Sequence, residues 1–350
     1  LRWGEALNAE LLQLGLDAEA RAAATLVPAI AAGHIEPSQL TPRFSPIVCQ
    51  LIDGIRRLET LREFDTAKPG DGALEQRAER LRKLMLSMVE DVRVPVIKLA
   101  SELVKLRDAQ ALSASELTET ANHAMQLYAP LAGRFGMGQL KWELEDLAFR
   151  ALDNARYKEL AKRLAERRTD REARVEAITA ELSGRLRQAG VSAELSGRAK
   201  HILSIWRKMQ RKDVDLDQLF DLSAVRVLVD DVAACYAALG VVHGAWTHIP
   251  GEFDDYITRP KPNGYRSLHT AVIGPQGHTM EVQIRSREMH TEAELGIAAH
   301  WRYKEGVTSH GHIGSEDTMV TGLRGLLEAR TGEDPGDVLA AMQSEAWDDH

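Results

Sequence analysis

The chain has 350 residues, enough for two domains with separate hydrophobic cores, and its formal net charge is −8 at pH 7. This negative charge argues against binding nucleic acid through overall electrostatic attraction. No run of about eighteen apolar residues occurs and no signal peptide is visible, so we expect a cytoplasmic protein without membrane contact. Cys49 and Cys235 lie far apart in the sequence, which favours free thiols in a reducing compartment.

The first half of the chain has the pattern of a helical domain. Between residues 1 and 190, apolar residues recur at helical spacing, and the good helix formers Ala, Leu, Arg and Glu dominate. Clusters of Pro and Gly, such as the one at Lys68–Gly72, separate the helical segments. We expect an all-helical domain over residues 1–154 and charged connecting helices over residues 155–195.

The second half changes to a mixed α/β pattern. Short β-branched runs, a turn sequence and two segments of helical spacing follow one another between residues 196 and 306. The expected elements are a strand at Ala224–Val229, a helix at Asp231–Leu239, a hairpin of Leu268–Ile273 with His278–Ile284, and a helix at Ser286–Trp301. We therefore predict a sheet of four or five strands, followed over residues 307–350 by a flexible segment and a C-terminal helix.

Two carboxylates are the strongest candidates for chemistry, because the sequence has neither a phosphate-loop motif nor a metal-spaced Cys and His cluster. Around Glu281, polar Gln283 and Arg285 alternate with apolar residues, which places the polar set on one face of a strand. Such a face can simply be exposed to solvent. Asp221, however, opens another predicted strand, and two carboxylates from neighbouring strands can hold one Mg²⁺ for phosphoryl or nucleotidyl transfer.

A basic segment could collect a triphosphate. On the helix predicted through Gly197–Lys208, Lys200, Ser204 and Lys208 fall along one side, and Arg198 stands at its start. A basic helix side is usually just solvated. This one could equally bind phosphates, with Arg198 stacking on a base.

A stiff loop containing two prolines and a glycine precedes the predicted hairpin. It displays Lys261, Asn263, Tyr265 and His269. Tyr265 offers a flat face to a base, and Lys261 and His269 could contact phosphate. A tyrosine in such a loop is more often a packing residue, so the loop alone does not decide the function.

Motifs from both halves together resemble the RelA/SpoT homologue family of long alarmone synthetases. The resemblance covers roughly residues 80–306 and implies an α+β multidomain fold, in which an all-α HD-type domain precedes a nucleotidyltransferase-like synthetase domain with a mixed sheet. The motifs are Tyr128–Ala132, Gly138–Asp146, Glu252–Tyr256, Lys261–Tyr265, Ser267–Thr270, Glu281–Arg285 and Ala293–Trp301.

The resemblance implies that the terminal diphosphate of ATP is transferred to the 3′-hydroxyl of GTP or GDP, which makes the alarmone (p)ppGpp of the stringent response. Asp221 and Glu281 would hold Mg²⁺, and Glu281 would help to deprotonate the attacking hydroxyl. The residues implied for ATP are Arg198, Lys200, Ser204, Lys208 and His269. Those implied for the guanine nucleotide are Lys261, Asn263, Tyr265, Gln283 and the backbone at Ala293, with His269 also assigned to this side.

An acidic stretch distinguishes the chain from bifunctional members of that family. Glu252, Asp254 and Asp255 stand where bifunctional relatives have an Arg-x-Lys-Asp pattern, and so resemble synthetase-only members. We expect these carboxylates to add negative charge near the phosphates and to favour a different number of metal ions or a different donor geometry.

The helical half resembles the family's HD hydrolase domain but lacks its metal ligands. Val27 and Pro28 stand where a His-Asp pair is expected, and Ser101 replaces the aspartate of a Leu-Ala-Asp motif. Nearby His34 and Glu36 have the character of loop residues. Because Val and Pro offer no side-chain ligand, we expect no Mn²⁺ site and no hydrolysis.

Two alternatives stay open. One is a catalytically weak guanine-nucleotide sensor, which the presence of both Asp221 and Glu281 disfavours. The other is a bifunctional synthetase–hydrolase, which Val27, Pro28 and Ser101 disfavour. Long members of the family respond to ribosomes carrying uncharged tRNA through C-terminal domains that lie outside this sequence. The sequence does not indicate the oligomeric state or the preference between GTP and GDP.

Overall fold

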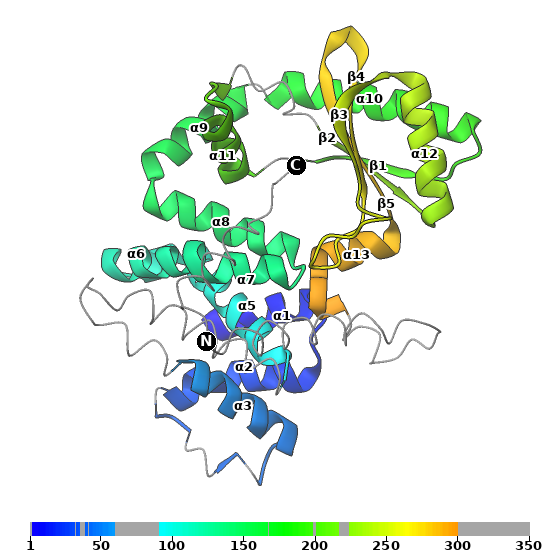
Figure 1. Cartoon of the computed structure of the whole chain (residues 1–350). Helices are drawn as coiled ribbons and strands as arrows, with labels where there is room; N and C mark the ends of the chain where they lie inside the picture. The colour runs from blue at the N-terminus through cyan, green and yellow to red at the C-terminus, as the bar shows by residue number, and fades with distance from the viewer. Residues whose placement is uncertain are drawn as a thin grey trace, which may run out of the picture. The chain divides into compact units, whose positions relative to one another are not determined.

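The computed structural model in Figure 1 describes residues 2–31, 33–35, 39–40, 42–59, 91–166, 168–198, 201–216 and 224–299. The chain divides into two compact units, Leu1–Ala148 with Leu295–His350, and Phe149–Glu294. Among the described helices, none combines the length and the apolar character that crossing a membrane requires. Our predictions for Glu36, Lys200, Asp221 and residues 307–350 lie outside the described residues.

The described part of the first unit is helical up to α8, as the sequence predicts. Local capping supports this at α6, where Ser113 Oγ accepts from the Glu116 backbone N–H and a Glu116 carboxylate oxygen accepts from the Ser113 N–H. The elements are α1 Arg2–Gln13, α2 Ala18–Ala31, α3 Pro46–Glu59, α5 Arg93–Arg107, the 3₁₀ turn Ala109–Ala111, α6 Ala114–His123, the π-helical turn Ala124–Tyr128, α7 Ala129–Arg134 and α8 Gly138–Leu152.

Helix α5 is buried along most of its length. Its apolar residues, such as Leu99 and Leu103, lie in the core together with charged ones. Lys98 Nζ lies 2.7 Å from Glu102 Oε1, and Lys105 Nζ lies 3.0 Å from the same oxygen. The buried charges of Lys98 and Glu102 therefore compensate one another within the helix, and Glu102 also pairs with the half-buried Lys105.

The segment after α13 packs on the turn that follows α7. Ile297 N–H donates to the Phe135 carbonyl at 2.9 Å, and Gly296 has φ +55°. A Cβ atom at Gly296 would overlap the backbone of Phe135 and Gly136, so only glycine fits here. The helix predicted for Ser286–Trp301 is wrong in its bounds for this reason: α13 spans Arg287–Leu295, and a 3₁₀ turn at Gly296–Ala298 replaces its continuation.

The second unit is built on a five-stranded sheet with the order β1-β2-β5-β4-β3 (Figure 1). Strands β2 and β5 are parallel, and the other neighbouring pairs are antiparallel. The elements are α9 Asn154–Glu166, α10 Arg168–Gln188, β1 Glu194–Arg198, α11 Ile202–Lys212, β2 Ala224–Val229, α12 Val232–Ala245, β3 Thr247–Asp255, β4 Leu268–Ile273, the 3₁₀ turn Pro275–Gly277, β5 Thr279–Ser286 and α13.

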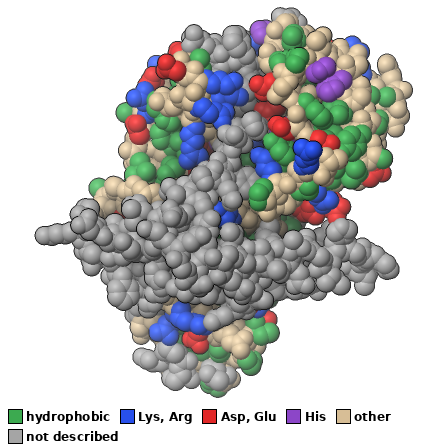
Figure 2. Space-filling model, viewed as in Figure 1, with side chains coloured by type: hydrophobic (Ala, Val, Ile, Leu, Met, Phe, Trp, Pro, Cys, Tyr) green, Lys and Arg blue, Asp and Glu red, His purple; other side chains and the backbone are tan. Residues whose placement is uncertain are grey.

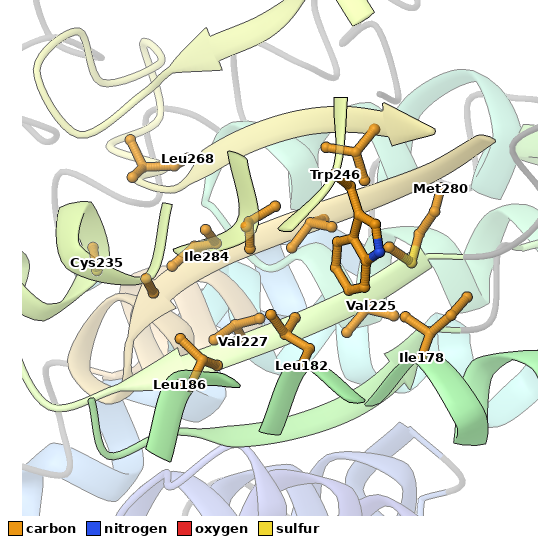
Figure 3. Close-up of a cluster of buried hydrophobic side chains, with 14 of the residues drawn as sticks. Ile178, Leu182, Leu186, Val225, Val227, Cys235, Trp246, Leu268, Met280 and Ile284 are labelled. Carbon is orange, nitrogen blue, oxygen red and sulfur yellow. The ribbon is translucent and has the colours of Figure 1, made fainter. Parts of the chain in front are cut away.

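One face of the sheet forms the core of this unit. Figure 3 shows Ile178, Leu182 and Leu186 of α10 directed toward Val225 and Val227 of the sheet. Cys235 of α12 is buried in the same cluster, and burial, followed by the charge of Asp231, raises the pKa of its thiol to about 11. Because side chains alternate along a strand, the residues between these apolar ones lie on the opposite face.

Several predicted elements of this unit are confirmed. Strand β2 has the expected bounds, β4 and β5 pair as the expected hairpin, and the number of strands is within the predicted range. Both cysteines are free thiols. Helix α10, which we expected only to connect domains, instead contributes Ile178, Leu182 and Leu186 to the core. The domain boundaries that we drew stay predictions.

The start of the basic segment differs from our prediction. Arg198 is the last residue of β1 rather than the start of a helix, and α11 begins only at Ile202. Strand β1 pairs with β2 over its whole length and passes so close to α10 that a Cβ atom at Gly197 would lie 2.7 Å from Val175 Cγ1. We predicted Lys200, Ser204 and Lys208 along one side of a single helix. Of these three residues, only Ser204 and Lys208 belong to α11.

Candidate functional site

The second face of the sheet carries the polar residues predicted from β5. Glu281 lies on the central strand, and its direct cross-strand neighbours are Ala224 on β2 and Ala271 on β4. Both neighbours are alanines, so no bulky side chain stands beside the carboxylate in the directly paired positions. Gln283, two residues further, is paired with Arg226 and His269.

Glu281 is a buried carboxylate with polar neighbours. Glu281 is only 8% exposed, and its Oε1 atom accepts a hydrogen bond of 2.8 Å from Gln283 Nε2. Arg198 Nη1 lies 3.9 Å and His269 Nδ1 lies 4.0 Å from the same oxygen. The fold therefore brings three predicted site residues from different strands around Glu281. They are Arg198 of β1, His269 of β4 and Gln283 of β5.

His269 is held in its neutral form. Burial lowers its pKa to about 3, and the opposing effect of Glu281 is weaker. The hydroxyl of Tyr265 lies 2.8 Å from His269 Nε2. His269 Nδ1 is buried and has no hydrogen-bond partner among the described residues. A buried ring nitrogen of this kind is a candidate contact for a bound ligand.

The loop before β4 is ordered by its own backbone bonds. Asn263 Oδ1 accepts from the Tyr265 N–H at 3.0 Å, Lys261 N–H donates to the Tyr265 carbonyl at 3.1 Å, and Gly264 has φ +78°. Lys261 Nζ lies 4.7 Å from the centroid of the Tyr256 ring. The structure thus brings Lys261, Tyr265 and His269 together, and it gives Asn263 a role in shaping the loop.

Basic side chains gather over α9 and α11, as Figure 2 shows. Arg156 of α9 contacts α11, because its Cζ lies 4.6 Å from the centroid of the Trp206 ring, and Arg163 of α9 lies 2.7 Å from the carboxylate of Asp215, just after α11. Ser204 and Lys208 are one turn apart on α11 and partly buried. We predicted ATP contacts for these two residues, and those contacts stay a prediction.

The acidic stretch is divided between the two faces of the sheet. Asp254 is paired with His269 and shares its face, whereas Asp255 accepts from the Tyr236 hydroxyl at 2.9 Å on the α12 side. Burial alone would raise the pKa of Asp255, but hydrogen bonds, led by the one from Thr258 N–H, lower it. Asp255 therefore orders the turn after β3, and Glu252 and Asp254 are the two that stay available to the polar face.

Four more residues complete the polar face. Arg285 of β5 lies on it, as the alternation along that strand predicted, and the residues that the sequence did not single out are Arg226 of β2 and Glu294 and His290 of α13. The alternation of Val225, Arg226 and Val227 was the signal for the first of them. Ala293, which we predicted for the guanine nucleotide, is buried in α13 beside Glu294.

The positions where a hydrolase would have its metal ligands carry side chains that are not typical ligands. Val27 and Pro28 lie within α2, and Ser101 is buried in α5 between Lys98 and the Glu102–Lys105 pair. His34 is exposed. Over the described ranges, no group of three or more His, Cys, Asp and Glu side chains could hold a metal ion.

Comparison with known proteins connects both units to one family. The region found in RelA and SpoT proteins matches residues 197–308, and an HD domain matches residues 6–138. The GTP pyrophosphokinase of Photobacterium angustum is 42% identical over 351 residues, which cover 100% of this chain and 47% of that protein. The probable guanosine-3′,5′-bis(diphosphate) 3′-pyrophosphohydrolase of a Synechocystis species is 38% identical over 342 residues, which cover 97% of this chain and 44% of that protein.

Among solved structures, the small alarmone synthetase 1 of Bacillus subtilis bound to its product pppGpp is 22% identical. The match covers 49% of this chain and 94% of that chain, with a TM-score of 0.33. The chain spans about half the length of the curated relatives named above. Since nearly its whole length is similar to these relatives, and since the region found in RelA and SpoT proteins and an HD domain both match it, the chain belongs to the RelA/SpoT family.

Proposed function

We propose that the chain is a GTP pyrophosphokinase of the cytoplasm, which transfers the terminal diphosphate of ATP to the ribose 3′-hydroxyl of GTP or GDP. The observation that carries the proposal is the buried Glu281 between Ala224 and Ala271, with Arg198 and neutral His269 within 4.0 Å of its Oε1 atom. This arrangement supplies a proton acceptor, small neighbouring side chains and groups that can bind phosphate on one face of a sheet.

The carboxylates fit the metal ion that such chemistry requires. Mg²⁺ takes oxygen ligands and usually binds through one or two carboxylates, with substrate phosphates and water completing its shell. Glu281 and, outside the described residues, Asp221 would hold it. The bound ion would neutralise charge on the phosphates during transfer.

The protein's own groups would then act as follows. Glu281 takes the proton of the 3′-hydroxyl, whose oxygen attacks the β-phosphorus of ATP. The bond between the α,β-bridging oxygen and the β-phosphorus breaks, and AMP leaves with the electron pair. Gln283 keeps the Glu281 carboxylate in place through its 2.8 Å hydrogen bond.

The two nucleotides would be held by the groups around Glu281. Arg198, Ser204, Lys208 and, outside the described residues, Lys200 bind ATP. Lys261 binds phosphate, and Tyr265 stacks on guanine while Asn263 keeps the loop in shape. If the Tyr265 hydroxyl donates to His269 Nε2, the proton of the neutral ring is on Nδ1, which then donates to a phosphate oxygen. Stacking gives little base selectivity, so base-edge hydrogen bonds near Gln283 and Ala293 would select guanine.

A first test is nucleotide synthesis by purified protein with labelled ATP, GTP and Mg²⁺. We expect Glu281→Gln and Asp221→Asn each to lower turnover by at least about a hundredfold without loss of folding. Glu288→Gln, at an exposed carboxylate of α13, is the control and should keep full activity. A Glu281→Gln protein with wild-type turnover would overturn the proposal.

We further propose that the helical unit does not hydrolyse the product. Val27, Pro28 and Ser101 offer no ligands for a Mn²⁺ site of the HD type. One relative is named as a probable pyrophosphohydrolase, which makes the bifunctional alternative worth a direct test. Incubation with Mn²⁺ and the guanosine tetraphosphate should release no pyrophosphate, and steady release would support the bifunctional alternative. A nucleotide sensor would bind both nucleotides without turnover in the first assay.

The acidic stretch and the wider partners complete the proposal. Glu252 and Asp254, with Asp255 in a structural role, add negative charge near the phosphates and favour a different number of metal ions than in bifunctional relatives. Replacing Glu252 with Arg and Asp254 with Lys should shift the Mg²⁺ optimum of synthesis, and an unchanged optimum would contradict this.

A response to ribosomes carrying uncharged tRNA is proposed only for a longer protein that includes further domains.

A further inference from the structure

The end of helix α13 contacts two arginines of the polar face. Glu294 Oε1 accepts a hydrogen bond of 3.0 Å from Arg285 Nη2 and lies 3.5 Å from Arg226 Nη2. Arg285 belongs to the central strand β5 and Arg226 to its parallel neighbour β2. A single carboxylate oxygen therefore stands between two guanidinium groups that come from different strands.

The two arginines would not adopt this arrangement by themselves. Both lie on the same face, and Arg285 is only 2% exposed, so water screens their repulsion poorly. Burial and then the positive charge of Arg285 lower the pKa of Arg226. The contribution of Arg285 to this lowered pKa reflects the same repulsion. Glu294 offsets it, because its negative charge attracts both groups at once.

Arg285 is fixed by a second contact from α13. Its Nη2 atom lies 2.7 Å from His290 Nδ1. Arginine can only donate, so His290 Nδ1 is the acceptor and its proton is on Nε2. Glu294 and His290, one helical turn apart, together determine where the Arg285 guanidinium lies.

Both arginines keep a buried donor for a further partner. The Nε atoms of Arg226 and Arg285 are buried and have no hydrogen-bond partner within the part of the chain that the structure describes. Buried guanidinium N–H groups are rarely left in this state. The face that carries them also carries Glu281 and His269, where the nucleotides are proposed to react.

We propose that Glu294 is a positioning residue for the nucleotide site, which holds Arg226 and Arg285 in the orientation that contacts a bound nucleotide. It acts through these two arginines and does not itself touch the substrate. This inference rests on the proposed function for the identity of the ligand. It differs from a purely structural role, in which Glu294 would affect the stability of the protein but not its affinity for nucleotides.

The experiment compares Glu294→Gln with a matched control on the same helix. Glu292→Gln removes the charge of a carboxylate that pairs with Arg266 at 2.7 Å, near the surface. Binding of α,β-methylene ATP in the presence of Mg²⁺ is measured by calorimetry, together with the melting temperature. We expect the dissociation constant to rise about tenfold in Glu294→Gln, as for one misplaced charge-assisted hydrogen bond, and less than about twofold in Glu292→Gln.

Kinetic measurements separate positioning from stability. In Glu294→Gln the KM for ATP or for the guanine nucleotide should rise about tenfold, and the melting temperature should also fall, because the repulsion between Arg226 and Arg285 is no longer offset. An unchanged dissociation constant and KM would overturn the inference, as would a lower melting temperature with unchanged affinity. If Glu294→Gln does not fold, Glu294→Asp decides by the same criteria, with an expected loss of affinity of about threefold.

A second variant tests the route through Arg226. In an Arg226→Gln background, Glu294→Gln should weaken binding by less than about threefold, because one of its two targets is gone. A full tenfold loss there would mean that Glu294 does not act through Arg226.

The wild-type protein separates this inference from the proposed function. Wild-type protein that binds the ATP analogue without synthesis would count against the proposed function, but the dissociation constants would still decide the role of Glu294. Wild-type protein that does not bind the analogue at all would overturn both.

Discussion

In both units two cations share one carboxylate oxygen, but the two groups differ in whether their buried donors have partners. In α5 of the helical unit, Lys98 Nζ and Lys105 Nζ lie 2.7 and 3.0 Å from Glu102 Oε1, and among the described residues these three side chains have no buried polar atom without a hydrogen-bond partner. On the polar face of the sheet, Arg226 and Arg285 share Glu294 Oε1, and each keeps a buried Nε without a partner among the described residues. The first group therefore satisfies its buried donors within the protein, whereas the second has two buried donors that a ligand can satisfy. This difference separates charges that support a fold from charges that support binding.

The largest expected effect is the loss of stability when Glu102 is removed from the charged group in α5. Glu102→Leu leaves Lys98 in the core without its carboxylate, and the free energy of unfolding of the helical unit should fall by about 3–5 kcal/mol. Urea unfolding followed by tryptophan fluorescence measures it, because Trp3 and Trp142 belong to this unit.

The matched variant is the double change Lys98→Met with Glu102→Leu. Since no uncompensated Lys98 charge stays behind, most of the lost stability should return. Neither variant should change the dissociation constant for nucleotides. A single variant as stable as the wild type would mean that the α5 charges do not support the fold.

A smaller loss of stability is expected at Gly296. Gly296→Ala would force the backbone away from Phe135 and would cost about 2–3 kcal/mol, of which the positive φ accounts for about 1 kcal/mol. Gly33→Ala is the control, because Gly33 has φ +72° but no atom within 4 Å of a Cβ position. Equal losses in the two variants would show that the contact with Phe135 contributes nothing.

On the sheet, the effect of a charge change should appear in binding rather than in stability. Arg226→Gln removes the repulsion with Arg285, so the free energy of unfolding should stay within about 1 kcal/mol of the wild type or rise. The dissociation constant for α,β-methylene ATP should rise at least about tenfold. If instead the variant unfolds easily and binds normally, the two units use their charges in the same way and the comparison fails.

The sequence predicted the parts of this arrangement that depend on local pattern. Alternation in β2 and β5 predicted both strands, and the turn at Gly274 predicted that β4 forms a hairpin with β5. It also placed Glu281 and Gln283 on one face. Asp221, the second carboxylate predicted to hold the metal ion, lies outside the described residues and stays a prediction.

What the sequence did not predict depends on contacts between distant segments. Arg198 was assigned to a helix because the short polar strand β1 has no apolar alternation, and only its pairing with β2 defines it. Asp255 was grouped with Asp254, although consecutive residues of a strand face opposite sides. Glu294 could not be found, since its role depends on how α13 packs against Arg285 of the preceding strand and against Arg226, which is far away in sequence.

The smallest expected effect is a change in the pH dependence of stability at His290. Burial, then Arg285 and Arg226, lower the pKa of His290 from 6.5 to about 4, while Glu294 and Glu194 partly oppose this. The unfolded chain therefore takes up a proton below about pH 6.5 that the folded chain does not take up until about pH 4. The contribution of His290 to stability is full above pH 6.5 and is lost as the pH falls through this window.

His290→Asn tests this, because an amide oxygen can still accept from Arg285 but does not titrate. Urea unfolding of the variant should depend less steeply on pH between about 6.5 and 4 than that of the wild type. His278→Asn, at an exposed histidine of the hairpin turn, is the control and should follow the wild type. Parallel curves for His290→Asn and the wild type would mean that burial and the two arginines of the sheet face do not keep His290 neutral.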